Sequence, residues 1–208
     1  MTTTKTKTKT KAKTKTKAYK LPKGKSLVLR VCRADMSSSH GFVWPRSGRV
    51  EAPDWRATSE CGHGLHGWLW GVGDITCTDL HAAPDAVYLV VEVGTSALVD
   101  LAGKVKFRRG LVVYAGARDD AVRMVQTHAP VDAGPFLWGT ATAGYAGTAT
   151  AGNRGTATAG LYGCIAIEWW DSALGAYRKA VAEVDGERIK PGVAYVVRGG
   201  QLAPKDAP

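Results

Sequence analysis

Three residues with metal-binding or catalytic side chains lie close together in one Gly-rich segment. Cys61, His63 and His66 follow the pattern Cys-x-His-x-x-His. Thiolate and imidazole groups are the usual ligands of zinc, which needs four in a structural site, or three plus water in a catalytic one. A fourth ligand would come from a Cys or His elsewhere in the chain: Cys32, His40, Cys77 or His81. The segment therefore offers a zinc site, although its spacing matches no standard zinc motif.

The same residues fit three other interpretations. Cys61 with His63 or His66 would form a thiol nucleophile and its base, and His66 alone would serve as a base or bind a substrate. In the interpretation that we favour, the glycines allow tight turns and the histidines are structural. The chain has no P-loop, G-x-S-x-G or H-E-x-x-H motif, and no G-x-G-x-x-G after a strand. We therefore do not expect an enzyme, and zinc is the one cofactor that the residues point to.

Three octapeptides follow one another directly at residues 139–162: GTATAGYA, GTATAGNR and GTATAGLY. The alternation of Thr and Ala predicts a β-strand in each octapeptide, with Thr on one face and Ala on the other. Glycines at both ends allow tight corners between the strands. With two octapeptides per turn, the sequence predicts a short, flat β-solenoid at residues 131–162.

The segment after the repeats indicates which face of these strands is buried. Ile165 and Ile167 stand where Ala stands within the repeats, so we expect Ala to face inward and Thr to face outward. The expected surface array consists of six threonines: Thr140, Thr142, Thr148, Thr150, Thr156 and Thr158. Three octapeptides are too few to fold alone, so the flanking segments must stabilise them. Exposed solenoid edges would also allow self-association.

Residues 1–25 alternate Lys with Thr and contain ten lysines and no acidic residue. The other 18 basic residues equal the 18 acidic residues, so the net charge of +10 belongs to this segment. A segment without an apolar face cannot bury enough surface to fold, so this segment is expected to be disordered. It either binds a polyanion such as nucleic acid or is only a solubilising extension. The expected polyanion contacts are Lys5, Lys7, Lys9, Lys11, Lys13, Lys15 and Lys17.

Apolar patterns place the remaining elements. Runs rich in β-branched residues predict strands at 26–33, 87–93, 104–107, 111–115, 163–170, 176–184 and 193–198. One helix is expected at 117–128, before Pro130, whereas 34–60 should be irregular and 61–74 a Gly-rich loop. The predicted organisation is a disordered tail (1–25), an α+β domain (26–130), the β-solenoid (131–162) and a small antiparallel β-sheet cap (163–208).

Two stretches resemble known families. The pattern Cys61-x-x-Gly64-Leu65-His66, with Gly41-Phe42-x-Trp44 before it and the strand 87–93 after it, resembles a domain of unknown function in bacterial and phage proteins. This resemblance implies a domain from Leu27 to Tyr114 but carries no established chemistry. The TATAG units are similar to the Thr-rich repeats of bacterial ice-nucleation proteins and other ice-binding solenoids, which implies a flat Thr array that faces ordered water.

Composition limits the location and role of the chain. No apolar run approaches the length of a transmembrane helix, no signal-peptide pattern opens the sequence, and four separated cysteines are expected to be free thiols. We therefore expect a cytoplasmic protein without membrane contact. The expected role is structural, with the solenoid spacing or presenting a globular domain. The alternatives are a metal-binding domain or enzyme centred on His63 and His66, nucleic-acid association through the tail, and an ice-binding-like Thr array.

Overall fold

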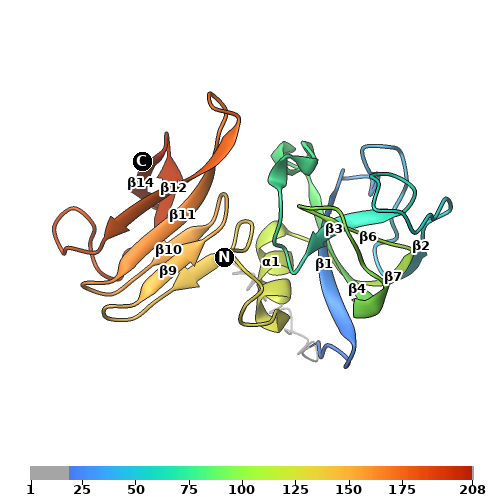
Figure 1. Cartoon of the computed structure of the whole chain (residues 1–208), viewed down its shortest axis with the longest axis horizontal. Helices are drawn as coiled ribbons and strands as arrows, with labels where there is room; N and C mark the ends of the chain where they lie inside the picture. Colours follow the sequence, from blue (N-terminus) through green and yellow to red (C-terminus); the bar gives the residue numbers. More distant parts are fainter. Residues whose placement is uncertain (1–18, 208) are drawn as a thin grey trace, which may run out of the picture.

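The computed structural model describes residues 19–207. In this range fourteen strands form three sheets, and the only α-helix is α1, Arg118–His128. Figure 1 shows two units side by side with α1 between them. We call residues 19–138, which contain the largest sheet and α1, the first unit. Residues 139–207, which contain the octapeptides and the C-terminal strands, are the second unit.

The first unit is built on a seven-stranded sheet with the strand order β2-β7-β4-β1-β3-β6-β5. Every pairing in it is antiparallel. Its strands are β1 (Lys25–Cys32), β2 (Gly48–Glu51), β3 (Leu65–Leu69), β4 (Val87–Gly94), β5 (Val99–Asp100), β6 (Val105–Phe107) and β7 (Arg109–Gly116). Three short 3-10 helices connect them: Ile75–Cys77, Leu80–Ala82 and Thr95–Ala97.

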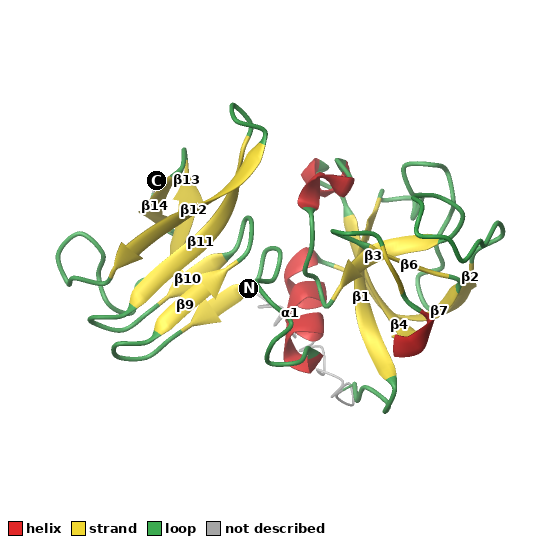
Figure 2. Cartoon of the chain, in the orientation of Figure 1, coloured by secondary structure: helices red, strands yellow, loops and turns green. Residues whose placement is uncertain are grey.

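The central strands β1 and β4 are buried on both faces because both of their alternating side-chain rows are apolar. Leu27 and Leu29 of β1 face a core that includes Val122 and Val125 of α1. Val28 of β1 faces a second core on the opposite side of the sheet, which includes Phe107. The helix lies against the first of these faces, as Figure 2 shows. A two-sided sheet needs continuous apolar runs, and SLVLRVC and VYLVVEV supply them.

The second unit consists of two small sheets. One has the order β14-β13-β10-β8 and the other the order β12-β11-β9. Their strands are β8 (Thr140–Thr142), β9 (Thr148–Ala151), β10 (Thr156–Thr158), β11 (Cys164–Asp171), β12 (Ala176–Glu183), β13 (Tyr195–Arg198) and β14 (Gln201–Pro204). The first and third octapeptides pair in parallel as β8 and β10, and β9 pairs in parallel with β11, which follows the repeats.

A core of small apolar side chains lies between these two sheets. Ala149, Ala151, Ala157 and Ala159 are at most 2% exposed, and Ile165 and Ile167 are fully buried among them. In β9 the threonines are exposed and the alanines buried, as strict alternation requires. Because Ala fills so little space, the larger side chains of the C-terminal strands complete the core.

The expected fold class is wrong in two respects. The first unit is a β-sheet domain with one helix, not an α+β domain, and its sheet does not close. The repeats form no separate solenoid under a separate cap, because their strands are divided between two open sheets that also contain the C-terminal strands. The physical reason is the small number of octapeptides: three leave unpaired edges, and strands of the C-terminal hairpins pair with those edges directly. The domain boundaries expected from the sequence stay a prediction.

Several elements correct the expected local structure. The segment 61–74 is not a continuous loop, because Leu65–Leu69 forms β3 between β1 and β6. The segment 34–60 contains β2, and β5 and β14 were not expected. These strands are short or rich in Gly and polar residues, so their apolar periodicity is weak. The expected strands from 26 to 198 and the helix at 117–128 are present, with ends shifted by a residue or two.

Candidate functional sites

Strands β1, β3 and β6 place three basic residues close to one another in the first sheet, with Arg30 on one face and His66 and Lys106 on the other. His66 of β3 lies directly opposite Lys106 of β6. Arg30 of β1 donates from Nη1 to the backbone oxygen of His66 at 3.4 Å. We call Arg30, His66 and Lys106 the cationic cluster. Sheet pairing, and not proximity in the sequence, assembles it, since its members lie far apart along the chain.

Lys106 is fully buried, which is unusual for a lysine and requires polar partners. Its Nζ donates to the backbone oxygen of Glu60 at 2.8 Å and to Oγ1 of Thr58 at 3.4 Å. The same ammonium group lies 5.8 Å from the centre of the Trp55 ring. No ion pair of residues 19–207 includes Lys106 or Arg30, so neutral groups alone stabilise both charges there.

Arg30 packs its guanidinium over the ring of Trp44, 5.7 Å from the ring centre. The Nε of Arg30 and the Nε1 of Trp44 are buried and have no hydrogen-bond partner within the described residues. Burial lowers the pKa of Arg30, although the neighbouring thiol of Cys32 acts in the opposite direction. Buried donors without acceptors are rare in folded proteins, so this part of the cluster is suited to an added acceptor.

His66 is half-buried, and its Nε2 also has no partner in the described part of the chain. Burial, together with the positive charges of Lys104, Arg30 and Lys106 that act in the same direction, lowers the pKa of His66 to about 4. The imidazole is therefore neutral at neutral pH and a weak base. The surrounding cations disfavour a metal ion and favour an anion or a neutral acceptor, because like charges repel at short range.

The structure does not bring Cys61, His63 and His66 together as a ligand set. Within residues 19–207 no group of three or more Cys, His, Asp or Glu side chains is placed to hold a metal ion. Cys61 is exposed, with its Sγ 3.2 Å from Nζ of Lys104. His63 is exposed, with its Nδ1 3.3 Å from a carboxylate oxygen of Asp54. The structure thus gives the three residues no common site. The zinc interpretation and the thiol-nucleophile interpretation both stay predictions.

The six threonines of the expected surface array divide between the two sheets of the second unit. Thr140, Thr142, Thr148 and Thr150 are exposed on the edge strands β8 and β9. Thr156 is 9% exposed and Thr158 half-buried, both on β10. The threonines of β8 pair in register with those of β10. The exposed threonines thus form two short rows on different sheets.

The junction between the units depends on Tyr177 and Trp138. The hydroxyl of Tyr177 donates to Oδ1 of Asp74 at 2.8 Å and accepts from the backbone N–H of Ile75 at 3.1 Å. Trp138 packs its ring in the first unit, 5.7 Å from the ring of Trp68. Its backbone N–H donates to the oxygen of Asn153 in the second octapeptide at 3.0 Å. Both residues therefore contact both units.

Helix α1 protects the open edge of the repeats. The side-chain Nε2 of Gln126 donates to the backbone oxygen of Thr140 on the edge strand β8 at 2.7 Å. Proteins commonly avoid edge-to-edge aggregation by keeping edge strands short and by covering their unpaired backbone groups. The first unit thus contacts one of the two edge strands of the repeats.

Sequence reasoning missed most of the cationic cluster. The sequence predicts only a strand for the run that contains Arg30, whereas the structure buries the Nε of Arg30 against Trp44. Lys106 carried a usable signal, since it lies between the apolar residues Val105 and Phe107. The roles of Tyr177 and Gln126 depend on contacts between distant segments, and no local pattern indicates them. The lysines from Lys5 to Lys17 lie outside the described residues, so their expected polyanion contact stays a prediction.

The chain is similar to two groups of known proteins. Residues 26–124 match the family model of a domain of unknown function, DUF7666. The chain is also 40% identical over 103 residues to an ice nucleation protein of Pseudomonas syringae, and 35% identical over 109 residues to one of Xanthomonas campestris pv. translucens. These segments cover 49% and 51% of this chain, but only 9% and 7% of the relatives.

The chain therefore spans less than a tenth of the length of these two relatives. The matches support the expected resemblance to a domain of unknown function and to ice nucleation proteins. It stays a prediction that the first resemblance is due to the C-x-x-G-L-H residues and the second to the TATAG units. No solved structure matches the chain significantly. Among residues 19–207 no helix has the length and apolar character needed to cross a membrane.

Proposed function

We propose that the protein has a structural role, in which the first unit holds the threonine-bearing strands of the second unit in a fixed orientation toward a partner surface or a second copy. The observation that carries this proposal is the contact of Tyr177 with Asp74 and Ile75 across the two units. Trp138 and Gln126 add a packed ring and a hydrogen bond at the same junction. A cytoplasmic location stays part of this proposal.

Calorimetry of the full chain tests the rigid junction. We expect the two units to unfold in one cooperative transition, and the variant Tyr177→Phe to lower its temperature or split it. The matched control is Tyr145→Phe, because Tyr145 is 73% exposed and lies in the first octapeptide, away from Asp74. Two separate transitions in the unaltered protein would overturn the proposal, since the units would then be joined only by the chain.

A second candidate function is contact with ice or ordered water. It is favoured by the similarity to proteins named ice nucleation protein and by the exposed pair Thr140 and Thr142, which is in register with Thr156 and Thr158. The test is the freezing temperature of supercooled droplets that contain the full chain. We expect Thr142→Lys to reduce any effect, whereas Ser47→Lys adds the same charge at an exposed position outside the repeats. Equal freezing temperatures with and without the protein would exclude this function.

A further inference from the structure

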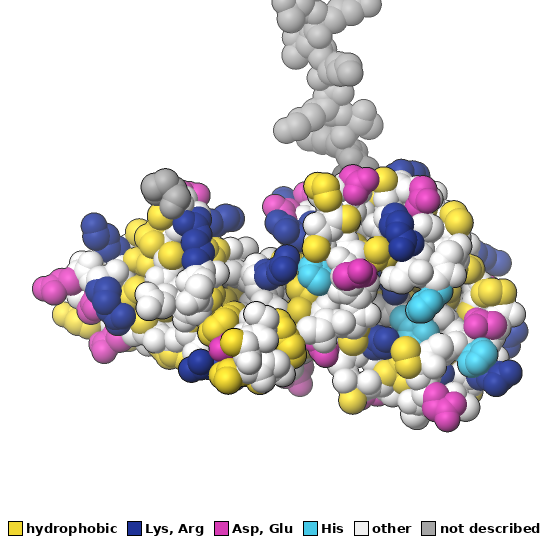
Figure 3. All heavy atoms as spheres, turned by 90° about the horizontal axis from the view of Figure 1, so that it is seen from above, with side chains coloured by type: hydrophobic (Ala, Val, Ile, Leu, Met, Phe, Trp, Pro, Cys, Tyr) yellow, Lys and Arg dark blue, Asp and Glu magenta, His cyan; other side chains and the backbone are white. Residues whose placement is uncertain are grey.

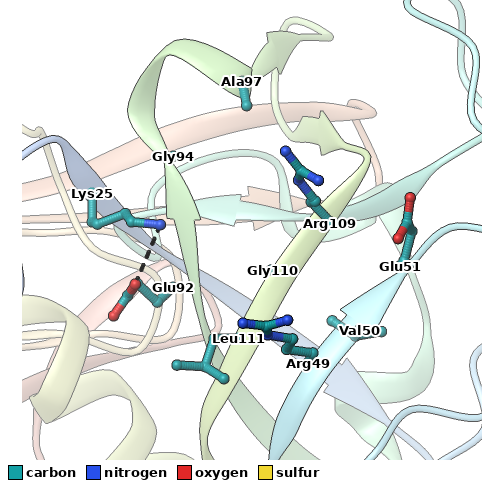
Figure 4. A pocket seen from close by; sticks show the side chains of 10 residues that line it. All are labelled: Lys25, Arg49, Val50, Glu51, Glu92, Gly94, Ala97, Arg109, Gly110 and Leu111. Carbon is teal, nitrogen blue, oxygen red and sulfur yellow. Dashed lines mark ion pairs between the residues drawn. The ribbon is translucent and has the colours of Figure 1, made fainter.

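An open groove of about 690 Å³ lies on the first unit beside strands β1, β2, β4 and β7. Its basic lining residues are Lys25, Arg49 and Arg109, and its acidic ones are Glu51 and Glu92. Figure 4 shows the two arginine side chains on the same side of the β2–β7 pair, with the Lys25–Glu92 ion pair on the β1–β4 side. We call this surface the basic groove.

Arg49 and Arg109 are close neighbours on one face of the sheet. In the β2–β7 register Arg49 lies opposite Leu111, and Arg109 lies two residues before Leu111 on the same strand. Such diagonal neighbours are within reach of each other's long side chains, and like charges there repel. Both residues are exposed, and neither has an ion pair or a side-chain hydrogen bond within the described chain. An anion between them would remove the repulsion.

The acidic residues of the groove already have partners. The Glu92 side chain is only 9% exposed, accepts from the hydroxyl of Tyr19 at 2.7 Å and lies 3.5 Å from Nζ of Lys25. Glu51 accepts from Nε of Arg108 at 2.9 Å, a residue outside the groove lining. Glu51 lies opposite Arg109 and stays half-exposed, so the three cations of the lining exceed its two carboxylates by one charge.

The basic surface extends along the chain beyond the groove. Tyr19 reaches Glu92, so the segment that leads into β1 begins at the groove, and Lys20 and Lys23 on this segment are exposed. Several separated cations fit an extended anion with repeated charges better than a single small ion. Arginine also suits phosphate in particular, because its planar fork donates two parallel hydrogen bonds.

We propose that the basic groove binds the phosphate backbone of a nucleic acid, with Arg49 and Arg109 each contacting a phosphate and the lysines of the segment 20–25 supporting the same strand. This site is distinct from the cationic cluster, which lies among buried residues of β1, β3 and β6. It is also distinct from the proposed structural role, which depends on the junction between the units.

The test is binding of a fluorescently labelled duplex DNA to the full chain over a range of salt concentrations. The double variant Arg49→Gln/Arg109→Gln should bind several-fold more weakly. Each lost phosphate contact should also reduce the slope of log affinity against log salt by about 0.9, so the double variant should lose about 1.8. Replacement by Lys at both positions should restore the slope but not the full affinity, because the charge returns without the fork.

The matched control is Arg56→Gln/Arg154→Gln, which removes two exposed arginines that also lack an ion pair in residues 19–207 and lie outside the groove. It should leave the slope nearly unchanged. A groove variant with the slope and affinity of the unaltered protein, and with an unchanged melting temperature, would overturn the proposal. An equal loss of heparin binding would also overturn it, because heparin carries sulfate and the groove would then be a general polyanion surface.

Discussion

The hydroxyl of Tyr177 lies 2.8 Å from Oδ1 of Asp74, although the two residues belong to different units of the molecule. The same carboxylate oxygen accepts from the backbone N–H of Thr76 at 2.8 Å and from its hydroxyl at 2.7 Å. Burial and the bond to Asp74 raise the pKa of Tyr177 to about 12. Burial works against the Asp74 carboxylate, but the bonds from Thr76 and Tyr177 outweigh it and hold the pKa of Asp74 below its usual value.

We first predict a coupling between these two residues. Tyr177→Phe should lower the free energy of unfolding by about 1–2 kcal/mol and Asp74→Ala by more, because each removes the partly buried hydrogen bond between these residues and Asp74→Ala also removes the bonds from Thr76. The double variant should lose less than the sum of the two, by about 1 kcal/mol, since both changes remove the same contact. Chemical denaturation of the three variants measures the coupling, and strictly additive losses would contradict it.

The second prediction concerns pH and His66. Its folded pKa of about 4 lies below the ordinary value of 6.5, so the unfolded chain binds a proton more readily between these two values. Stability is therefore fully present above pH 6.5 and falls as the pH is lowered toward 4, by at most about 3 kcal/mol. His66→Gln should flatten this part of the stability curve.

The control for the pH prediction is His40→Gln, because His40 is exposed. This variant should follow the same pH dependence as the unaltered protein. An unchanged curve in His66→Gln would show that another group accounts for any acid destabilisation, and that the cationic cluster has little influence on His66.

The third prediction contrasts adjacent residues of the third octapeptide. Ala157 is fully buried between the two sheets, so Ala157→Leu should overpack the core and cost about 1–3 kcal/mol. Thr158 is half-buried on the other face of the same strand, and Thr158→Val should change stability by less than about 0.5 kcal/mol. Thermal unfolding measures both. A silent Ala157→Leu together with a damaging Thr158→Val would mean that the strand faces are reversed.

The fourth prediction concerns Gly67, where β3 passes very close to β1. An added methyl group would contact the Val28 side chain and lie 2.6 Å from the backbone oxygen of Leu29. Gly67→Ala should therefore destabilise the first unit by about 2–3 kcal/mol. Gly144→Ala is the control, because a methyl group there would meet no atom within 4 Å. Equal melting temperatures for both variants would contradict this packing.

The fifth prediction concerns the lysine-rich N-terminal segment. If Lys5 to Lys17 contact a polyanion, a chain that starts at Gly24 should be retained less by heparin or DNA than the full chain, with the difference shrinking at high salt. Affinity chromatography over a salt gradient measures this retention. Equal retention of both chains would leave the segment with no role beyond solubility.

The sequence allowed prediction of those elements whose apolar pattern is strong and local. The run SLVLRVC and the run VYLVVEV predict β1 and β4 because both faces of these strands are buried. Leu65–Leu69 was mistaken for loop because Gly67 interrupts the pattern, although the close approach to Leu29 is what requires a glycine there. The division of the repeat strands between two sheets was not predictable in the same way, because it depends on which distant strands pair with the edges of the repeats.

For the candidate sites, the types and spacing of residues did not indicate which side chains lie near one another in the fold. The motif Cys61-x-His63-x-x-His66 selects the correct segment, but only His66 lies on a strand, and its neighbours Arg30 and Lys106 come from elsewhere in the sheet. The three spaced residues point in different directions because Gly62 and Gly64 and the positive φ of His63 turn the backbone between them. Local spacing alone cannot indicate such a turn.

The pairing of alternate segments has a consequence for how the gene can change in length. Thr140–Thr142 pairs with Thr156–Thr158 of the third octapeptide, and the second octapeptide pairs with the segment after the repeats. The effect of a length change therefore depends on whether an odd or an even number of octapeptides is gained or lost. Gain or loss of one octapeptide would move the first octapeptide, which Gln126 contacts, from the sheet of β13 to the sheet of β11 and β12, whereas gain or loss of two would keep it in its sheet. Duplications of two octapeptides at a time are thus the length changes that this architecture accepts.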